Sequence, residues 1–490
     1  MTTSPPAAPV LSIVTVSIRD GMVTFPYTQA IQARGGDPPF VWSVSSGSLP
    51  HNLALASAST YSAAIAGTPD TAQTASFTIE ATDAAGQSAS ESYTLNINSA
   101  GSAQLQPVSG EVAAGTIEIQ GLSAGSFNPA YWQQDTLNWV PDVREPMFSA
   151  QTTGIYQNIY APWPLEQPDG WRMFYGGWDG VDVPHDEIHS APTPDFLTFG
   201  SRDLIIGNGA FLNVNNVNVQ QSPDGSLHMI CTGGQAGNAP NWPLYFSSPD
   251  GVTWNGTPEP YAAQFTDAIN MQGYAGFGAG NFNGANVLLL DNGAWVLYFV
   301  NWNNTGNVYR ATATTLPNFQ FQGAALQSDH LVNDVKKFEA NGTNWYLMGL
   351  HYNTQSLWYS LSNDGVTFQP EQSLFNHLSA QDLYIVALGF VTKGNQVLGA
   401  LYGASGVSTL DQNQIFARWL QKRVVIADSS GTQFAQQGGY GPDRQWFPAP
   451  ASGSLQGMIW VFDEDGITPL ASGSINVNQG EAYQLVLGGG

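Results

Sequence analysis

Five segments rich in Trp, Asn, His, Tyr and Gly carry the side chains best suited to bind a ligand. They cover residues 176–187, 233–242, 301–307, 350–355 and 403–408, and they include Trp178, Asp179, Trp242, Trp302, His351 and Tyr352. Aromatic faces stack on the C–H surfaces of sugars, and amide and carboxylate groups form hydrogen bonds to hydroxyl groups. This pattern favours a surface that binds a neutral, hydroxyl-rich ligand. The alternative is that these are ordinary solvated loops of a Trp-rich protein.

Metal and thiol chemistry have weaker signals. His185 and His189 are four residues apart, but Glu187 stands in the third position and the context is a strand, so this is not the helical zinc motif. A strand would place both imidazoles on one side, which is a weak metal signal, and a solvated loop is the better interpretation. The single cysteine, Cys231, lies in an apolar run and is expected to be a small buried hydrophobe.

Two repeated turns indicate how these segments are positioned. An Asp-Gly or Asn-Gly hairpin followed by an apolar strand recurs, with a weaker last copy, at Gly170, Gly225, Gly293, Gly342 and Gly394. A second turn follows the first four copies, at 193–199, 248–254, 316–321 and 362–368. Two hairpins per unit of about 50 residues mean four antiparallel strands per unit. Five such units predict a five-bladed β-propeller over residues 127–437.

The propeller topology sorts the loops between two faces. If both repeated turns lie on one face, the five ligand-type segments lie on the other, beside the start of each innermost strand. The Asp and Gly residues of the repeated turns then build hairpins and take no part in catalysis.

The N-terminal part has a different pattern. Residues 1–10 are a Pro/Ala/Ser leader, and residues 11–98 alternate with period two between turns, which predicts a small β-sandwich. The motifs Gly47-Ser48-Leu49-Pro50, Ile65-Ala66-Gly67-Thr68-Pro69 and Ala81-Thr82-Asp83 resemble the immunoglobulin-like, cadherin-like modules of bacterial surface proteins. This resemblance implies a spacer or adhesive module.

Two further segments complete the chain. Residues 99–126 are expected to be a linker with one or two short strands, and residues 438–490 a small C-terminal β element. The predicted fold class is therefore all-β, with an immunoglobulin-like sandwich, a five-bladed propeller and this last element.

The propeller segment also resembles a known group. Its hairpins at 168–177 and 223–234 and its turn at 247–254 resemble those of the five-bladed propeller glycoside hydrolases of families 32, 43, 62, 117 and 130. In that group, two Asp at the starts of the first two innermost strands and a Glu in the third blade perform catalysis. Two carboxylates across a sugar ring are what glycosidic cleavage requires.

This sequence departs from that pattern at three of the five strand starts. Asn158 and Asn216 stand where the resemblance expects Asp, and the third start, at Asn286, has no carboxylate nearby. Only the fourth and fifth starts keep an acid, Asp334 and Asp382. Because Asn does not exchange a proton near neutral pH, either catalysis uses a relocated pair of acids or the pocket only binds glycan.

These considerations give the candidate site residues. A relocated pair would come from Asp142, Asp179, Asp186, Glu187, Asp334 and Asp382, and the catalytic candidates are Asp186, Asp334 and Asp382. The substrate-binding candidates are Asn158, Trp163, Trp178, Asp179, Asn216, Trp242, Asn286, Trp302, His351 and Tyr352. No cofactor is expected, and a structural calcium ion near the propeller axis is an open alternative.

Composition limits the partners. Of 490 residues, 37 are acidic and 13 basic, a formal charge of −24, so nucleic acids and anionic membranes are excluded as general partners. No apolar run is long enough for membrane insertion, and the N-terminus has no signal-peptide pattern. The expected location is extracellular: secreted, on the cell surface or on a virion.

The leading function is a carbohydrate-active propeller that binds, and in one interpretation cleaves, a polysaccharide. The alternative is a non-catalytic glycan-binding or adhesion protein.

Overall fold

The computed structural model describes residues 10–99, 101–110, 112–180, 185–235, 241–275, 286–301 and 306–488. These ranges are almost entirely β-structure, with one short α-helix, α1 (Pro129–Trp132), and two 3-10 turns, η1 (Gly154–Tyr156) and η2 (Phe265–Asp267). The predicted all-β class is confirmed. In the described part of the chain, no helix is long and apolar enough to cross a membrane.

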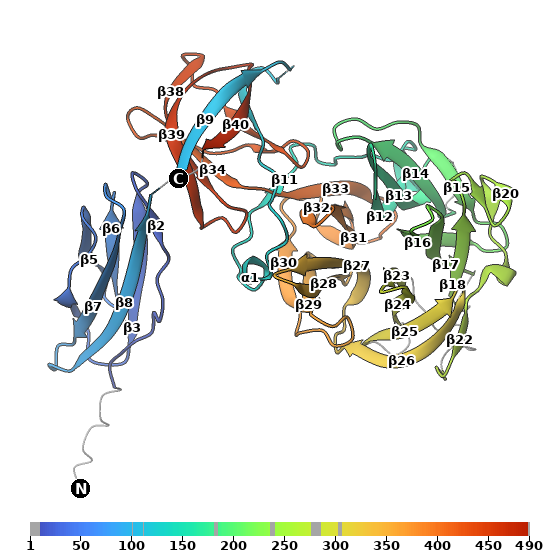
Figure 1. Cartoon of the computed structure of the whole chain (residues 1–490), viewed down its shortest axis with the longest axis horizontal. Coiled ribbons are helices and arrows are strands. Elements are labelled where there is room, and N and C mark those ends of the chain that lie inside the picture. The colour runs from blue at the N-terminus through green and yellow to red at the C-terminus, as the bar shows by residue number, and fades with distance from the viewer. Residues whose placement is uncertain are drawn as a thin grey trace, which may run out of the picture. The chain divides into compact units, whose positions relative to one another are not determined.

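The chain forms two compact units, and many of their strands are labelled in Figure 1. Unit 1 comprises Met1–Gly121, Lys422–Gln436 and Phe447–Gly490, and unit 2 comprises Leu122–Gln421 and Gln437–Trp446.

The first part of unit 1 is the predicted β-sandwich. One sheet has the order β1 (Ser12–Ile13), β3 (Tyr27–Arg34), β6 (Ser62–Gly67), β5 (Leu53–Ser59), and the other β2 (Gly21–Met22), β8 (Ser88–Asn98), β7 (Gln73–Thr82), β4 (Val41–Gly47). Alternate side chains of both sheets, among them Ile31, Ile65, Phe77 and Leu95, form one buried core. This inward alternation is the physical reason for the period of two in the sequence.

The second part of unit 1 is a sheet that joins distant segments. Seven of its nine strands follow the order β35 (Gln433–Phe434), β34 (Arg423–Asp428), β38 (Ser454–Phe462), β39 (Pro469–Asn478), β9 (Gly101–Val108), β40 (Ala482–Gly488), β10 (Thr116–Gln120). The expected linker thus supplies β9 and β10, and residues 423–434, expected at the end of the propeller, also belong here. The expected segment boundaries differ from the observed units because local patterns do not encode pairing between segments far apart in sequence.

Unit 2 is the predicted five-bladed propeller, formed by five sheets around a common centre (Figure 1). Blade 1 comprises β12 (Asn158–Gln167), β13 (Gly170–Trp178), β14 (Glu187–Thr193) and β15 (Asp203–Gly207), extended by β21 (Tyr261–Ala262). Blade 2 comprises β16 (Asn213–Gln221), β17 (Leu227–Gly234) and β18 (Trp242–Ser248), followed by the ribbon β19 (Thr253–Trp254) and β20 (Thr257–Pro258).

The next two blades repeat this arrangement. Blade 3 comprises β23 (Asn286–Asp291), β24 (Ala294–Val300), β25 (Val308–Thr315) and β26 (Asn318–Leu326), extended by β22 (Asn270–Gln272). Blade 4 comprises β27 (Leu331–Ala340), β28 (Thr343–His351), β29 (Ser356–Ser362) and β30 (Gln372–Asn376).

Blade 5 closes the ring. It comprises β31 (Tyr384–Lys393), β32 (Gln396–Ser405) and β33 (Gln414–Leu420), and its fourth strand is β11 (Trp139–Pro141). β11 lies at the beginning of unit 2 and pairs antiparallel with β33, so the last blade contains both ends of the ring. The innermost strands β12, β16, β23, β27 and β31 each contact the next, and β31 contacts β12. This closure explains why the fifth sequence repeat lacks its second turn.

The repeated turns are structural, as predicted. In the second turn of blades 1, 2 and 4, one carboxylate oxygen of Asp195, Asp250 or Asp364 accepts hydrogen bonds from the backbone N–H groups two and three residues later, at 2.7–3.1 Å. In the hairpin of blade 4, Asn341 and Gly342 have φ values of 53° and 74°, the left-handed conformation that such turns require.

Candidate functional site

The register of the inner hairpins defines two faces of the propeller. The innermost strands begin opposite the ends of the second strands, as in the pairs Asn158–Trp178 and Leu331–His351, and we call this the front face. The strands end at the Asp-Gly and Asn-Gly hairpins, and we call this the rear face. As the sequence predicted, the repeated hairpins lie on one face and the starts of the innermost strands lie on the other.

Asp186 is the most distinctive carboxylate of the front face. It precedes β14 and is 6% exposed. Its Oδ2 accepts hydrogen bonds from the Tyr160 hydroxyl and from Asn215 Nδ2, the latter at 3.0 Å. Its Oδ1 is buried and has no hydrogen-bond partner among the described residues. Burial raises the pKa of the Asp186 carboxyl, because the charged form loses its hydration.

The neighbours of Asp186 come from two innermost strands. Tyr160 lies on β12, and Asn213, Asn215 and Asn216 lie at the start of β16. The backbone N–H of Asp186 donates to Asn213 Oδ1 at 2.9 Å, and Asn216 Nδ2 donates to Asn215 Oδ1 at 2.9 Å. Burial and the adjacent carboxylate raise the pKa of Tyr160. We call these five residues the front-face cluster.

A local irregularity of the strands shapes this cluster. The pairing of β16 with β17 shifts between Asn215 and Asn218, and the pairing of β12 with β13 shifts between Tyr160 and Trp163. Ala161 and Asn216 have positive φ values of 49° and 55° at these shifts. Bulges of this kind bend a strand and redirect its side chains. Here they lie beside the residues that contact Asp186.

Asp334 does not have the environment of an open-site carboxylate. It is fully buried on β27, and its Oδ2 accepts a hydrogen bond from the backbone N–H of Phe390 at 2.7 Å. Its Oδ1 lies 3.5 Å from Lys336 Nζ, and that ammonium also lies 3.7 Å from the ring centroid of Trp163. Burial raises the pKa of Asp334 to about 6, against the opposing effect of Lys336. Asp334 therefore belongs to a buried ion pair inside the ring.

The other two candidate acids next to strand starts or ends are saturated by donors. Asp382 accepts from the backbone N–H groups of Leu378 and Ser379 and from the Tyr402 hydroxyl, the last at 3.0 Å. Asp179 accepts from the backbone N–H of Gln151 and the hydroxyl of Tyr175, and pairs with Arg202 at 3.1 Å. Both side chains are buried, so their bonds fix loops and leave little capacity for a ligand.

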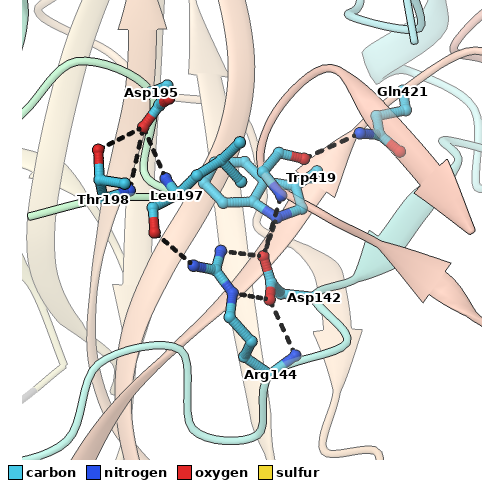
Figure 2. Close-up of polar contacts among 8 residues, drawn as sticks. Asp142, Arg144, Asp195, Leu197, Thr198, Trp419 and Gln421 are labelled. Atoms are coloured by element: carbon cyan, nitrogen blue, oxygen red, sulfur yellow. Dashed lines mark hydrogen bonds and ion pairs between the residues drawn. The ribbon is translucent and has the colours of Figure 1, made fainter. Parts of the chain in front are cut away.

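Asp142 is also structural, as Figure 2 shows. Its Oδ1 accepts from the backbone N–H and Nε of Arg144, and its Oδ2 from Arg144 Nη2 and Trp419 Nε1, all at 2.8–2.9 Å. The same Oδ2 accepts from the Gly441 backbone N–H at 3.2 Å. This network connects the segment after β11 to strand β33. Glu187, by contrast, is half-buried, and its Oε1 accepts from the Asn208 N–H at 3.2 Å.

The predicted substrate-binding residues do not all reach one surface. Asn158 is buried and bonds through Oδ1 to the backbone and side chain of Asn413, each at 2.9 Å. Trp163 is 1% exposed and donates to the Val219 carbonyl at 2.8 Å. Trp178 is buried, whereas Trp242 is half-buried at the start of β18.

The remaining candidates differ in accessibility. His351 is buried, and burial lowers its pKa to about 3, whereas Tyr352 is 45% exposed. Asn286 begins β23, but its side chain lies outside the described residues, as does the whole of Trp302.

Sequence reasoning missed a second polar group on blade 4. His330, just before β27, stacks on Trp358 with centroids 3.7 Å apart and meets Tyr352 edge-on at 5.9 Å. Its Nδ1 lies 2.7 Å from Glu371 Oε1, and Ser328 Oγ donates to Glu371 Oε2 at 2.6 Å. The aromatic and amide composition of the 350–355 segment was visible in the sequence. The approach of His330 to it required the tertiary structure.

The described residues were compared with the geometry that a metal-binding site requires. Within them, no group of three or more His, Cys, Asp or Glu residues could hold a metal ion. His189 stacks on Tyr175 at 5.6 Å, and His185 Nδ1 lies 3.1 Å from the Leu212 carbonyl oxygen.

The N-terminal module is similar to a known family. A family model described as "Putative Ig domain" matches residues 5–98. No curated protein matches the chain.

The chain is similar to solved structures of glycoside hydrolases. A protein named "Glycoside hydrolase" is 14% identical with a TM-score of 0.43, covering 59% of this chain and 93% of its own. A glycosyl hydrolase from Bacteroides ovatus is 11% identical with a TM-score of 0.42, covering 61% and 96%. An α-L-arabinanase from Penicillium chrysogenum is 13% identical with a TM-score of 0.37, covering 58% and 98%. At these identities the likeness says nothing of what this chain binds or cleaves.

Proposed function

We propose that the front face of the propeller binds a neutral glycan, and that binding is the main activity of this unit. The observation that carries the proposal is the front-face cluster, in which amide groups and a phenol surround a buried carboxyl with one unpartnered oxygen. A carboxyl whose pKa is raised can donate a hydrogen bond when protonated and accept one when ionised. Together with amides, which donate and accept, it matches the hydroxyl groups of a sugar.

The scarcity of available carboxylates favours binding over cleavage. Asp142, Asp179 and Asp382 are saturated by protein donors, and Asp334 is held in a buried ion pair. Cleavage of a glycosidic bond uses two carboxyl groups on opposite sides of the scissile bond. Of these five acids, Asp186 is the one that is neither saturated by donors nor held in an ion pair.

Cleavage is the second candidate function, and one observation favours it. Burial raises the pKa of Asp186, as expected of a general acid that must hold its proton before the reaction.

The proposed setting is extracellular, with a polysaccharide as partner and the immunoglobulin-like module as a spacer or adhesive part. Support comes from the charge-poor, acidic composition and from the family match of residues 5–98.

The experiment is a panel of soluble and insoluble polysaccharides, scored in parallel for retention of the protein and for release of reducing ends. We expect saturable retention on at least one neutral polysaccharide, reduced at least tenfold in Asp186→Asn and severalfold in Tyr160→Phe. The matched control is Asp169→Asn, an exposed acid in a rear-face hairpin. Release of reducing ends that Asp186→Asn abolishes would decide for the hydrolase, and absence of both readouts on the whole panel would overturn the proposal.

A further inference from the structure

The rear face holds a pocket at the opposite end of the ring from the front-face cluster. Its volume is about 270 Å³, and every innermost strand contributes to it near its end. Pro164, Leu165 and Glu166 come from β12, and Val219, Gln220 and Gln221 from β16. Leu289 comes from β23, and Lys336, Lys337 and Phe338 come from β27. Thr392 comes from the end of β31, and Gly394 from the turn that follows it. We call this the rear pocket.

Lys336 is the charged group with the least satisfied hydrogen-bonding capacity in this pocket. Its side chain is 14% exposed, and among the described residues its single carboxylate partner is Asp334 Oδ1, at 3.5 Å. Charge-assisted N–H···O bonds are normally about 2.7–2.9 Å long. Its other recorded contacts are the ring of Trp163 and an electrostatic attraction to Glu166. The ammonium group therefore has N–H donors available for a ligand.

An acceptor lies on another innermost strand, β12. Glu166 Oε2 accepts a hydrogen bond from the backbone N–H of Gly394 at 2.8 Å, whereas Oε1 has no hydrogen bond within the described residues. Gln220 and Thr392 add an amide and a hydroxyl, while Leu289 and Phe338 add apolar surface. Donors, acceptors and apolar surface thus surround one small volume.

The charges around the pocket nearly cancel, which favours a neutral ligand over an ionic one. Lys337 is neutralised by Asp291, whose Oδ1 lies 2.6 Å from its Nζ, and Asp334 offsets Lys336. The charge of Glu166 is then left over and disfavours an anion, while the ammonium groups of Lys336 and Lys337 repel a cation. The volume also lies just below the range of about 300–1,000 Å³ for pockets of drug-sized ligands.

We propose that the rear pocket is a binding site for a small neutral polyhydroxy compound, of the size of one sugar ring or a short polyol. Lys336 donates to a hydroxyl of the ligand, Glu166 accepts from another, and the apolar residues contact its C–H groups. This site is separate from the front-face cluster and does not depend on the function proposed for it.

The test is titration of the full chain with neutral monosaccharides, inositol and glycerol, and with acetate and phosphate as anionic probes. Ligand-observed NMR monitors the binding of each compound. Two variants alter the polar groups and keep size: Glu166→Gln removes the negative charge, although its amide oxygen still accepts from Gly394, and Gln220→Leu removes an amide. The matched control is Glu339→Gln, an exposed acid on β27 that is not part of the pocket. Lys336 is left intact because its removal would leave Asp334 buried without a cation.

We expect saturable binding of at least one neutral compound, weakened at least fivefold in both pocket variants and unchanged in Glu339→Gln. A crystal soaked in that compound is expected to show it between Lys336 and Glu166. Binding of phosphate or acetate in preference to every neutral compound would overturn the proposal. So would absence of saturable binding, or equal affinity in the pocket variants with thermal melts that show them folded.

Discussion

At the scale of single residues, the environment of each carboxylate decides its role. Asp142, Asp179 and Asp382 accept several hydrogen bonds each and hold the fold, while Asp186 keeps an oxygen without a partner. These residues are of one type and all are buried, so composition and spacing could not separate them. The difference arises from the donors that neighbouring strands bring to each of them.

The Asp142 network gives the first prediction at this scale. Asp142→Ala leaves the Arg144 guanidinium without its carboxylate and Trp419 Nε1 without its acceptor, and we expect a loss of about 3–5 kcal/mol in the free energy of unfolding. Urea unfolding monitored by tryptophan fluorescence measures it. Asp142→Asn, which keeps one acceptor oxygen, is expected to lose less, and equal losses in both variants would contradict this account.

His351 gives a prediction of pH dependence. Burial lowers its folded-state pKa to about 3, below the value near 6.5 in the unfolded chain. The unfolded chain therefore takes up a proton first as pH falls, so His351 costs about 1.4 kcal/mol of stability per pH unit between 6.5 and 3. We expect His351→Phe to remove this contribution.

The measurement is urea unfolding of both proteins at pH 6.5, 5.5 and 4.5. As pH falls, the unfolding free energy of the original protein should decrease more than that of His351→Phe. A constant difference across the three values would show that His351 is not held neutral.

At the scale of elements, the repeated turns position the blades. Asp364 Oδ1 accepts from the backbone N–H groups of Val366 and Thr367 at 2.8 and 2.9 Å, between β29 and β30. Asp250 makes the same bonds in blade 2 and Asp195 in blade 1. The same local hydrogen-bonding pattern therefore stabilises the outer turn of three blades.

The turn can be tested by a pair of substitutions. Asp364→Ala removes the acceptor of both N–H groups and is expected to cost about 1–2 kcal/mol of unfolding free energy. Asp364→Asn keeps an acceptor oxygen and should cost less than half as much, as measured by thermal or urea unfolding. If Asn were as destabilising as Ala, the hydrogen bonds would not be the cause.

At the scale of the whole molecule, the propeller depends on a closure between its two sequence ends. Val140 lies on β11, is fully buried and pairs with Trp419 of β33. A charge at this position would have to be buried without a partner, at a cost of several kcal/mol. Disruption of this one short strand therefore acts on the entire ring.

Val140→Asp is the corresponding prediction. We expect the calorimetric transition of unit 2 to fall by roughly 5–10 °C, while that of unit 1 remains in place. The control is Val486→Asp, at a position that is 36% exposed on β40, where a charge stays hydrated. If Val486→Asp lowered the transition of unit 2 as much as Val140→Asp does, burial of the charge would not be the cause. A single transition shared by both units would show that they do not unfold separately.

Features that depend on short-range geometry could be predicted from the amino-acid sequence. Period-two alternation in residues 11–98, and the Asp-Gly and Asn-Gly turns from Gly170 to Gly394, predicted the sandwich, the five blades and the two faces. These features can be read locally because φ angles and strand periodicity are properties of neighbouring residues.

Strand pairings and side-chain contacts between residues far apart in the chain became visible only in the tertiary structure. It placed β11 in blade 5, joined β9 and β10 to C-terminal strands, and brought Tyr160 and Asn215 to Asp186. It also showed that Asp382, Asp179 and Asn158 are occupied by structural hydrogen bonds. The physical reason is that the state of a buried polar group depends on its partners, and those partners arrive through folding from distant positions in the sequence.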